Sequence, residues 1–192
     1  ERRALWSQGV RFAAYTGLRL GEIRGLQWRD VNITGEVLAV RGNLPTSGPK
    51  LKDRKAPKSK AGRSVPLIEP AIVALDNVSK MGHPSGPRDL VFPSSNGRPL
   101  AQNHVRQAFY DGLETVGLGH LREEAEPIVF HDLRHTGTTR IVSTGLPSAL
   151  AMEITGHTQF STFKRYVNVD TDAARQAAAL LDRLNEEKPT ET

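Results

Sequence analysis

A histidine and an arginine near residue 130 suit the binding of a phosphate ester. His131 and Arg134 are three residues apart within the segment Phe130 to Thr136, so on a helix both side chains lie on one face. They make a poor core pair because both groups need polar partners. A guanidinium fork can bind two phosphate oxygens, and an imidazole can donate a hydrogen bond or move a proton. The spacing alone is common, so it indicates a phosphate site only in combination with other motifs.

A second arginine lies in the segment Thr16 to Glu22 and is followed by an acid. Arg19 and Glu22 are again three residues apart. In one interpretation they form a plain surface ion pair worth about 0.2–0.5 kcal/mol. In the other, Glu22 holds Arg19 so that its fork points at an anion.

Near the C-terminus a histidine precedes a tyrosine that is a candidate nucleophile. His157 follows Gly156 on an expected turn, and Tyr166 is nine residues further along, on an expected short helix. A tyrosine is usually a half-buried aromatic, and packing in amphipathic helices accounts for Tyr15 and Tyr110. Tyr166 has no such pattern around it.

A strongly basic segment extends from residue 50 to residue 63. It contains seven bases and one acid, Asp53; the bases are Lys50, Lys52, Arg54, Lys55, Lys58, Lys60 and Arg63. A lysine at the tip of a hairpin can reach a groove as a phosphate contact or as a proton donor. The neighbouring bases suit contacts with a DNA backbone, which add affinity without reading sequence.

Composition restricts the class of protein. The 192 residues have a net charge of +5, which favours a polyanionic partner. Cysteine is absent, which excludes disulfides and thiolate chemistry and fits a reducing cytoplasm. No run approaches the roughly 18 apolar residues of a membrane-spanning helix.

The elements that must position these residues follow from periodicity and from glycine and proline. We expect helices over residues 4–15, 18–28, 70–80, 102–116, 131–143 and 147–156, and strands at 36–40, 64–67 and 90–92. The fold class is therefore mainly α with a small antiparallel β-sheet (α+β). Residues 170–192 predict an amphipathic helix with a polar tail, after a domain that spans residues 1–169.

Taken in order, these motifs resemble those of the tyrosine recombinase (phage integrase) family. The resemblance rests on T-G-L-R-x-G-E, a lysine before V-P-L, H-x-L-R-H-T, and G-H followed by tyrosine, and it covers about residues 15–169. It implies a catalytic domain of that family. It also implies an N-terminal DNA-clamping domain, which we expect to be missing from this chain.

The resemblance assigns roles to the candidate residues. Arg19 and Arg134 correspond to the catalytic arginines, His131 and His157 to the box histidines, and Tyr166 to the nucleophile, with Glu22 as a supporting acid. Lys58 lies eight residues before Pro66, as the family lysine does, and Lys60 is the alternative. The other bases of the segment are candidate DNA-backbone contacts: Lys50, Lys52, Arg54, Lys55, Lys60 and Arg63.

The implied reaction is the cleavage and rejoining of double-stranded DNA through a 3′-phosphotyrosyl intermediate, with no metal, ATP or other cofactor. Lys58 is then the general acid, His131 a candidate base, and His157 a phosphate ligand. We expect a tetrameric synapse on DNA, a monomeric or weakly self-associating chain without DNA, and a cytoplasmic location in a bacterium, at the nucleoid. The helix after residue 170 docks either in cis or on a neighbouring protomer.

Three alternatives compete with this interpretation. A type IB topoisomerase uses the same tyrosine chemistry. A catalytically inactive DNA-binding module would not need all six reactive positions to be filled. A metal site built on His131 and His135 leaves the segment around Arg19 unexplained.

Overall fold

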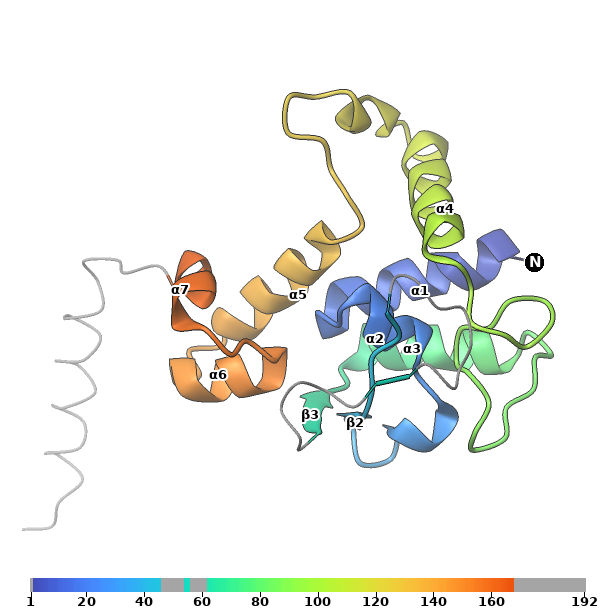
Figure 1. Cartoon of the computed structure of the whole chain (residues 1–192), viewed down its shortest axis with the longest axis horizontal. Helices are drawn as coiled ribbons and strands as arrows, with labels where there is room; N and C mark the ends of the chain where they lie inside the picture. The colour runs from blue at the N-terminus through green and yellow to red at the C-terminus, as the bar shows by residue number, and fades with distance from the viewer. Residues whose placement is uncertain (1, 46–53, 56–61, 168–192) are drawn as a thin grey trace, which may run out of the picture. The chain divides into compact units, whose positions relative to one another are not determined.

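The chain folds into short helices and one small sheet (Figure 1). The computed structural model describes residues 2–45, 54–55 and 62–167. The elements in chain order are α1 (Arg2–Thr16), α2 (Leu20–Arg24), η1 (Trp28–Asp30), β1 (Val31–Asn32), β2 (Val37–Val40), β3 (Arg63–Pro66), α3 (Glu69–Ser79), α4 (Gln102–Thr115), η3 (Gly119–Arg122), α5 (Asp132–Val142), α6 (Ser148–Thr155), α7 (Phe160–Phe163) and η4 (Lys164–Tyr166).

Helix α1 is the centre of the hydrophobic core and packs against α3, α4 and α5. Its apolar residues recur at helical spacing, and Trp6 and Phe12 are fully buried. Both rings contact Phe92, with centroids 5.8 and 5.4 Å apart. The helix that precedes Arg19 is therefore held on several sides, which gives the arginine a rigid base.

The sheet has three antiparallel strands in the order β1-β2-β3. In β2 and β3, Leu38 pairs with Val65 and Val40 with Arg63, and the three apolar members of these pairs are buried. Strand β3 also packs against α6. Arg63, the last base of the basic segment, is therefore the first residue of β3.

Two glycines allow α5 to approach the turn after α1. Gly17 has a φ of +63°, a left-handed conformation that favours glycine. A Cβ on Gly137 of α5 would lie 2.5 Å from both the Cα and the N of Gly17. Because Gly17 is two residues before Arg19 and Gly137 three residues after Arg134, this contact brings the two candidate arginines together.

The chain divides into two compact units, the first ending at Thr158 and the second beginning at Gln159. In the described part of the second unit, α7 leads into η4, which ends at Tyr166. Within the described residues, no helix is long and apolar enough to cross a membrane. The tail helix and the domain boundary predicted at residue 169 lie outside the described residues.

The predicted fold class is confirmed, and most expected helices form within a few residues of their predicted limits. The helix predicted for residues 18–28 is wrong in length, because α2 ends at Arg24 and η1 follows a turn at Gly25. The strand predicted at 90–92 is also wrong. Leu90 forms only an isolated bridge with Gln27, since the chain there crosses another loop rather than a strand.

The Gly17–Gly137 contact predicts a large effect of one methyl group. Gly137→Ala should lower the free energy of unfolding by about 1–3 kcal/mol, the usual cost of overpacking. Gly112→Ala in α4 is the matched control, because a Cβ there has no neighbour within 4 Å. Removing a helical glycine should raise stability at that position by about 0.5–1 kcal/mol. Urea unfolding of both variants checks this, and equal stabilities would contradict the close approach.

Candidate active site

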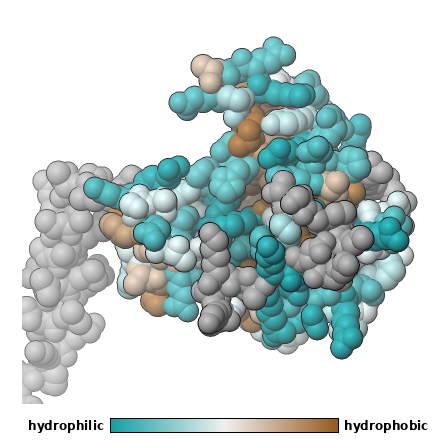
Figure 2. All heavy atoms as spheres, in the orientation of Figure 1, coloured by the Kyte–Doolittle hydropathy of each residue, from teal (hydrophilic) through white to brown (hydrophobic). Residues whose placement is uncertain are grey.

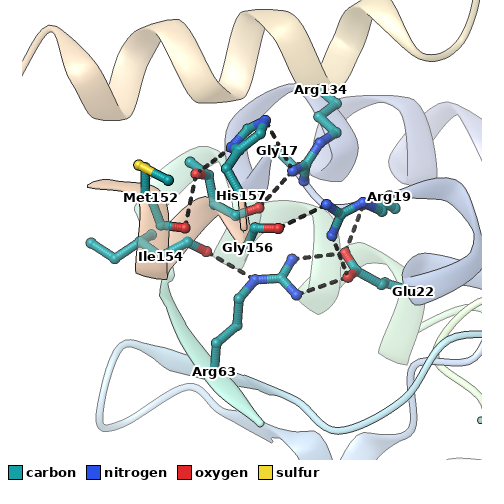
Figure 3. A network of polar contacts seen from close by, with 10 residues as sticks. Gly17, Arg19, Glu22, Arg63, Arg134, Met152, Ile154, Gly156 and His157 are labelled. Carbon is teal, nitrogen blue, oxygen red and sulfur yellow. Dashed lines mark hydrogen bonds and ion pairs between the residues drawn. The ribbon is translucent and has the colours of Figure 1, made fainter. Parts of the chain in front are cut away.

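Arg134 joins α5 to two turns of the first unit (Figure 3). Its Nη1 donates to the carbonyl oxygen of Gly17 at 2.7 Å, and its Nη2 donates to that of Thr155 at 2.6 Å. The same Nη2 lies 3.5 Å from Nε2 of His157. The residue is only 3% exposed. Its charge therefore acts from inside the fold, where the local dielectric constant is low.

Arg19 reaches the same turn from the start of α2. Its Nη2 donates to the carbonyl oxygen of Gly156 at 2.8 Å, next along the chain to the carbonyl that Arg134 binds. Its side chain is 42% exposed. The two predicted arginines thus converge on one turn, and Arg19 is the one that faces solvent.

Glu22 is buried and accepts hydrogen bonds from two arginines. Arg63 donates from Nη1 and Nη2 to the two carboxylate oxygens at 2.8 Å each, and the two side chains are 8% and 6% exposed. Arg19 adds one bond from its backbone N–H at 2.8 Å and one from Nη1 at 3.2 Å. Burial alone raises the pKa of Glu22, but the hydrogen bonds and charges of Arg63 and Arg19 outweigh it and lower the pKa below 4.5.

The pairing with Glu22 revises two sequence predictions. Arg63 was a candidate DNA-backbone contact, but in the structure its fork is used on Glu22 and its Nε donates to the carbonyl of Ile154 at 3.0 Å. Glu22 contacts Arg19, but its principal partner is Arg63, and the Glu22–Arg63 pair is buried rather than on the surface.

His157 is held by the turn that ends α6. Gly156 adopts a left-handed conformation there, and the backbone N–H of His157 donates to Met152. The Thr155 hydroxyl donates to the carbonyl of Ala151 at 2.7 Å and lies 2.7 Å from Nδ1 of His157. Since a hydroxyl has one proton, we assign the proton of the neutral imidazole to Nδ1. Nε2, which faces Arg134, is then an acceptor.

Both candidate histidines have a lowered pKa. Desolvation and the charges of Arg134, Arg19 and Arg63 lower the pKa of His157 from 6.5 to about 4. Desolvation, followed by the charges of His135 and Arg134, lowers the pKa of His131. The rings of His131 and His135 meet edge to face at 5.3 Å. Desolvation, together with the surrounding positive charge, therefore favours the neutral form of both imidazoles.

Another base of the basic segment, Arg54, forms a second largely buried ion pair. Arg54 donates to Asp30 at 2.6 Å and to Gln27 at 2.9 Å, and its side chain is 13% exposed. It was also a candidate DNA contact, but its charge is needed to compensate the fully buried carboxylate of Asp30. Lys55 pairs with Asn43 through its backbone and is exposed, as a DNA contact would be.

The remaining predicted residues belong to the second unit or lie outside the described residues. Tyr166 belongs to the second unit, where it is half-buried and its ring lies 5.9 Å from that of Phe163. Lys58 and its alternative Lys60 lie outside the described residues, as do Lys50 and Lys52.

Sequence reasoning missed the residues that hold the cluster together. Thr155 positions His157 by its hydroxyl, and Gly17 supplies a carbonyl to Arg134. For Arg63 the sequence indicates a position but not a partner: it is the last base of the basic segment and directly precedes the S-V-P-L stretch.

The lowered pKa of His157 predicts a loss of stability in acid. Between pH 6.5 and pH 4 the unfolded chain binds a proton at this histidine and the folded chain does not, so the free energy of unfolding falls as the pH falls. Urea unfolding across this range should show a shallower pH dependence for His157→Gln than for the parent chain. His120→Gln, at an exposed position of η3, is the control. An unchanged slope in His157→Gln would show that His157 titrates normally.

Comparisons with known proteins identify the family. The chain is 34% identical over 181 residues to a protein named as the prophage phiRv2 integrase of Mycobacterium tuberculosis H37Rv, covering 92% of this chain and 46% of that protein. It is 29% identical over 167 residues to the tyrosine recombinase XerD of Yersinia pestis, covering 84% of this chain and 48% of that protein. The chain thus spans about half the length of these relatives.

Solved structures show the same fold. The Tn1549 transposon integrase in complex with a circular intermediate DNA has a TM-score of 0.70 at 23% identity, over 92% of this chain and 57% of that one. The XerH site-specific recombinase bound to difH substrate has a TM-score of 0.66 at 20% identity, over 97% of this chain and 48% of that one. The profile of the phage integrase family matches residues 2–173. The chain therefore belongs to the phage integrase family.

Proposed function

We propose that this chain is the catalytic part of a site-specific DNA recombinase that cleaves and rejoins DNA through Tyr166. The observation that carries the proposal is the convergence of Arg19 and Arg134 on two adjacent carbonyls beside His157. A cluster of this kind binds an anion, and family membership makes the anion a DNA phosphate.

In the proposed reaction the Tyr166 oxygen attacks the scissile phosphorus. A bond forms between phosphorus and the tyrosine oxygen, the bond to the 5′-oxygen breaks, and the products are a 3′-phosphotyrosyl link and a 5′-hydroxyl. The link keeps the energy of the phosphodiester, so a 5′-hydroxyl from a partner strand can reseal it without ATP. Covalent catalysis replaces one hard step by two easier ones.

The two arginines stabilise the transition state of that attack. Negative charge grows on the non-bridging oxygens as the phosphorus becomes five-coordinate, and guanidinium N–H groups are preorganised donors for it. In the DNA-free chain, backbone carbonyls occupy donors of both arginines. A phosphate is a stronger acceptor because it is charged. Two cations then supply the electrostatic stabilisation that a metal ion provides in many phosphoryl-transfer enzymes.

Proton transfers need an acid for the 5′-oxygen and a base for the tyrosine. We assign the acid to Lys58, with Lys60 as the alternative, and the base to His131. His157 is the phosphate ligand. Because its Nε2 is an acceptor in the free chain, it must gain a proton there or exchange tautomers to donate to a phosphate oxygen.

The proposed partner is double-stranded DNA, with recombination in a tetrameric synapse. A net charge of +5 supports a polyanionic partner. The described surface is largely hydrophilic in the view of Figure 2. The Tn1549 integrase and XerH structures contain DNA. Action in the bacterial cytoplasm, at the nucleoid, is part of the same proposal.

Tyr166→Phe removes the nucleophile and should bind DNA like the parent chain but form no covalent adduct. The measurement is denaturing electrophoresis after incubation with nicked DNA that carries the target site and traps the cleaved strand. Tyr15→Phe is the matched control, since Tyr15 lies in α1 with the Arg140 guanidinium over its ring, and this variant should form adduct normally. An SDS-resistant complex with Tyr166→Phe would assign the attack to another residue.

Cleavage should not depend on a metal ion, because the arginines supply the positive charge. The rate of adduct formation should change less than about twofold when excess EDTA is added, at constant ionic strength because DNA affinity depends on salt. If EDTA abolished activity and Mg²⁺ or Mn²⁺ restored it, a metal ion rather than the two arginines would supply the positive charge in the transition state.

A further inference from the structure

Arg63 contacts Glu22 and the end of α6, just before His157, although it is not one of the predicted catalytic residues. Its Nη1 and Nη2 donate to the two oxygens of Glu22, and its Nε donates to the carbonyl of Ile154. A Cβ on Gly156 would lie 2.8 Å from the Arg63 Cζ, so the guanidinium lies directly against the turn that precedes His157. One side chain thus links β3, α2 and the end of α6 (Figure 3).

Glu22 divides its hydrogen-bonding capacity unequally between two arginines. Arg63 takes the fork-to-fork arrangement, with two bonds of 2.8 Å, whereas the Arg19 side chain makes a single bond of 3.2 Å. The fork-to-fork geometry is the stronger pairing of an arginine with a carboxylate. Because Arg63 occupies it, Arg19 is oriented by Glu22 without being fully paired.

We propose that Arg63 is a positioning residue that prevents Glu22 from pairing fork to fork with Arg19. Without Arg63, the nearest cation for the buried carboxylate is Arg19, and a bidentate pair would turn its guanidinium away from a phosphate and neutralise its charge. The inference rests on the proposed function, since it gives the freed N–H groups of Arg19 to the scissile phosphate. It replaces the expectation that Arg63 contacts the DNA backbone.

DNA affinity separates positioning from phosphate contact. The dissociation constant of Arg63→Met/Glu22→Gln for target DNA, measured against salt concentration, should have the same slope as that of the parent chain, because without the Glu22 charge Arg19 keeps its contact with the phosphate. The matched control is Lys55→Met, an exposed base of the same segment. A lysine that contacts a phosphate should reduce the slope by about 0.9 when it is removed. A reduced slope for the double variant would make Arg63 a DNA contact and overturn the proposal.

Single-turnover cleavage at saturating DNA tests whether Arg63 acts on the reaction through Arg19. Arg63→Met should slow cleavage at least about tenfold, in line with partial loss of one transition-state donor. Arg63→Met/Glu22→Gln also removes the carboxylate charge that would pair with Arg19. The double variant should therefore regain part of the lost cleavage rate. Thermal unfolding of both variants is measured first, and if Arg63→Met is unfolded, the double variant alone is compared with the parent chain. A double variant slower than Arg63→Met, or slower than the parent by as much as Arg19→Ala, overturns the proposal.

A neutral substrate gives a readout that a loss of packing would not change. Replacing one non-bridging oxygen of the scissile phosphate by a methyl group removes the charge that Arg19 neutralises. The slowing caused by Arg63→Met, or by the double variant if only that folds, should then be smaller on methylphosphonate DNA than on phosphate DNA, as for Arg19→Ala. Equal slowing on both substrates means a merely structural role. If the parent chain forms no adduct with either substrate, the proposed function itself is wrong.

Discussion

A single buried carboxylate, that of Glu22, determines how the candidate site is built. A carboxylate that is 6% exposed persists in its charged form only with close cationic partners. Here they come from two separate elements, Arg63 from β3 and Arg19 from the start of α2. Arg63 in turn binds a carbonyl at the end of α6. A buried ion pair contributes little net stability compared with apolar packing, so its principal effect is on geometry. It fixes the relative positions of three segments that are far apart in the chain.

The concentration of positive charge at one turn follows from that arrangement. Arg19 and Arg134 donate to the neighbouring carbonyls of Gly156 and Thr155, and His157 comes next along the chain. Glu22 and the carbonyl oxygens offset the electrostatic repulsion between these cations when the chain folds. An incoming anion therefore meets cations that are already assembled, which favours electrostatic stabilisation of a transition state. The pKa of about 4 at His157 is a direct consequence of the same charges and of desolvation.

The basic segment serves two physical purposes, although its sequence looks uniform. Arg54 and Arg63 are largely buried, against Asp30 and Glu22 respectively. Lys55, beside Arg54, is exposed. Arginine suits these positions because one planar fork bonds two acceptors at once: both carboxylate oxygens of Glu22 for Arg63, and one oxygen each of Asp30 and Gln27 for Arg54. Net charge thus overstates the number of bases that a DNA backbone can contact.

The sequence by itself determined the helices, the sheet and the family. Periodicity and glycine or proline stops indicate most elements, because both act over a few residues, and the ordered motifs around Arg19, His131 and His157 identify the phage integrase family. Only the tertiary structure decided the partners of Arg63 and Arg54. Their carboxylates are 41 and 24 residues away along the chain, and local spacing carries no information at that range. Sequence spacing reports which side chains share a helix face, whereas the contact of Gly17 with Gly137 and the register of β2 with β3 decide which elements meet.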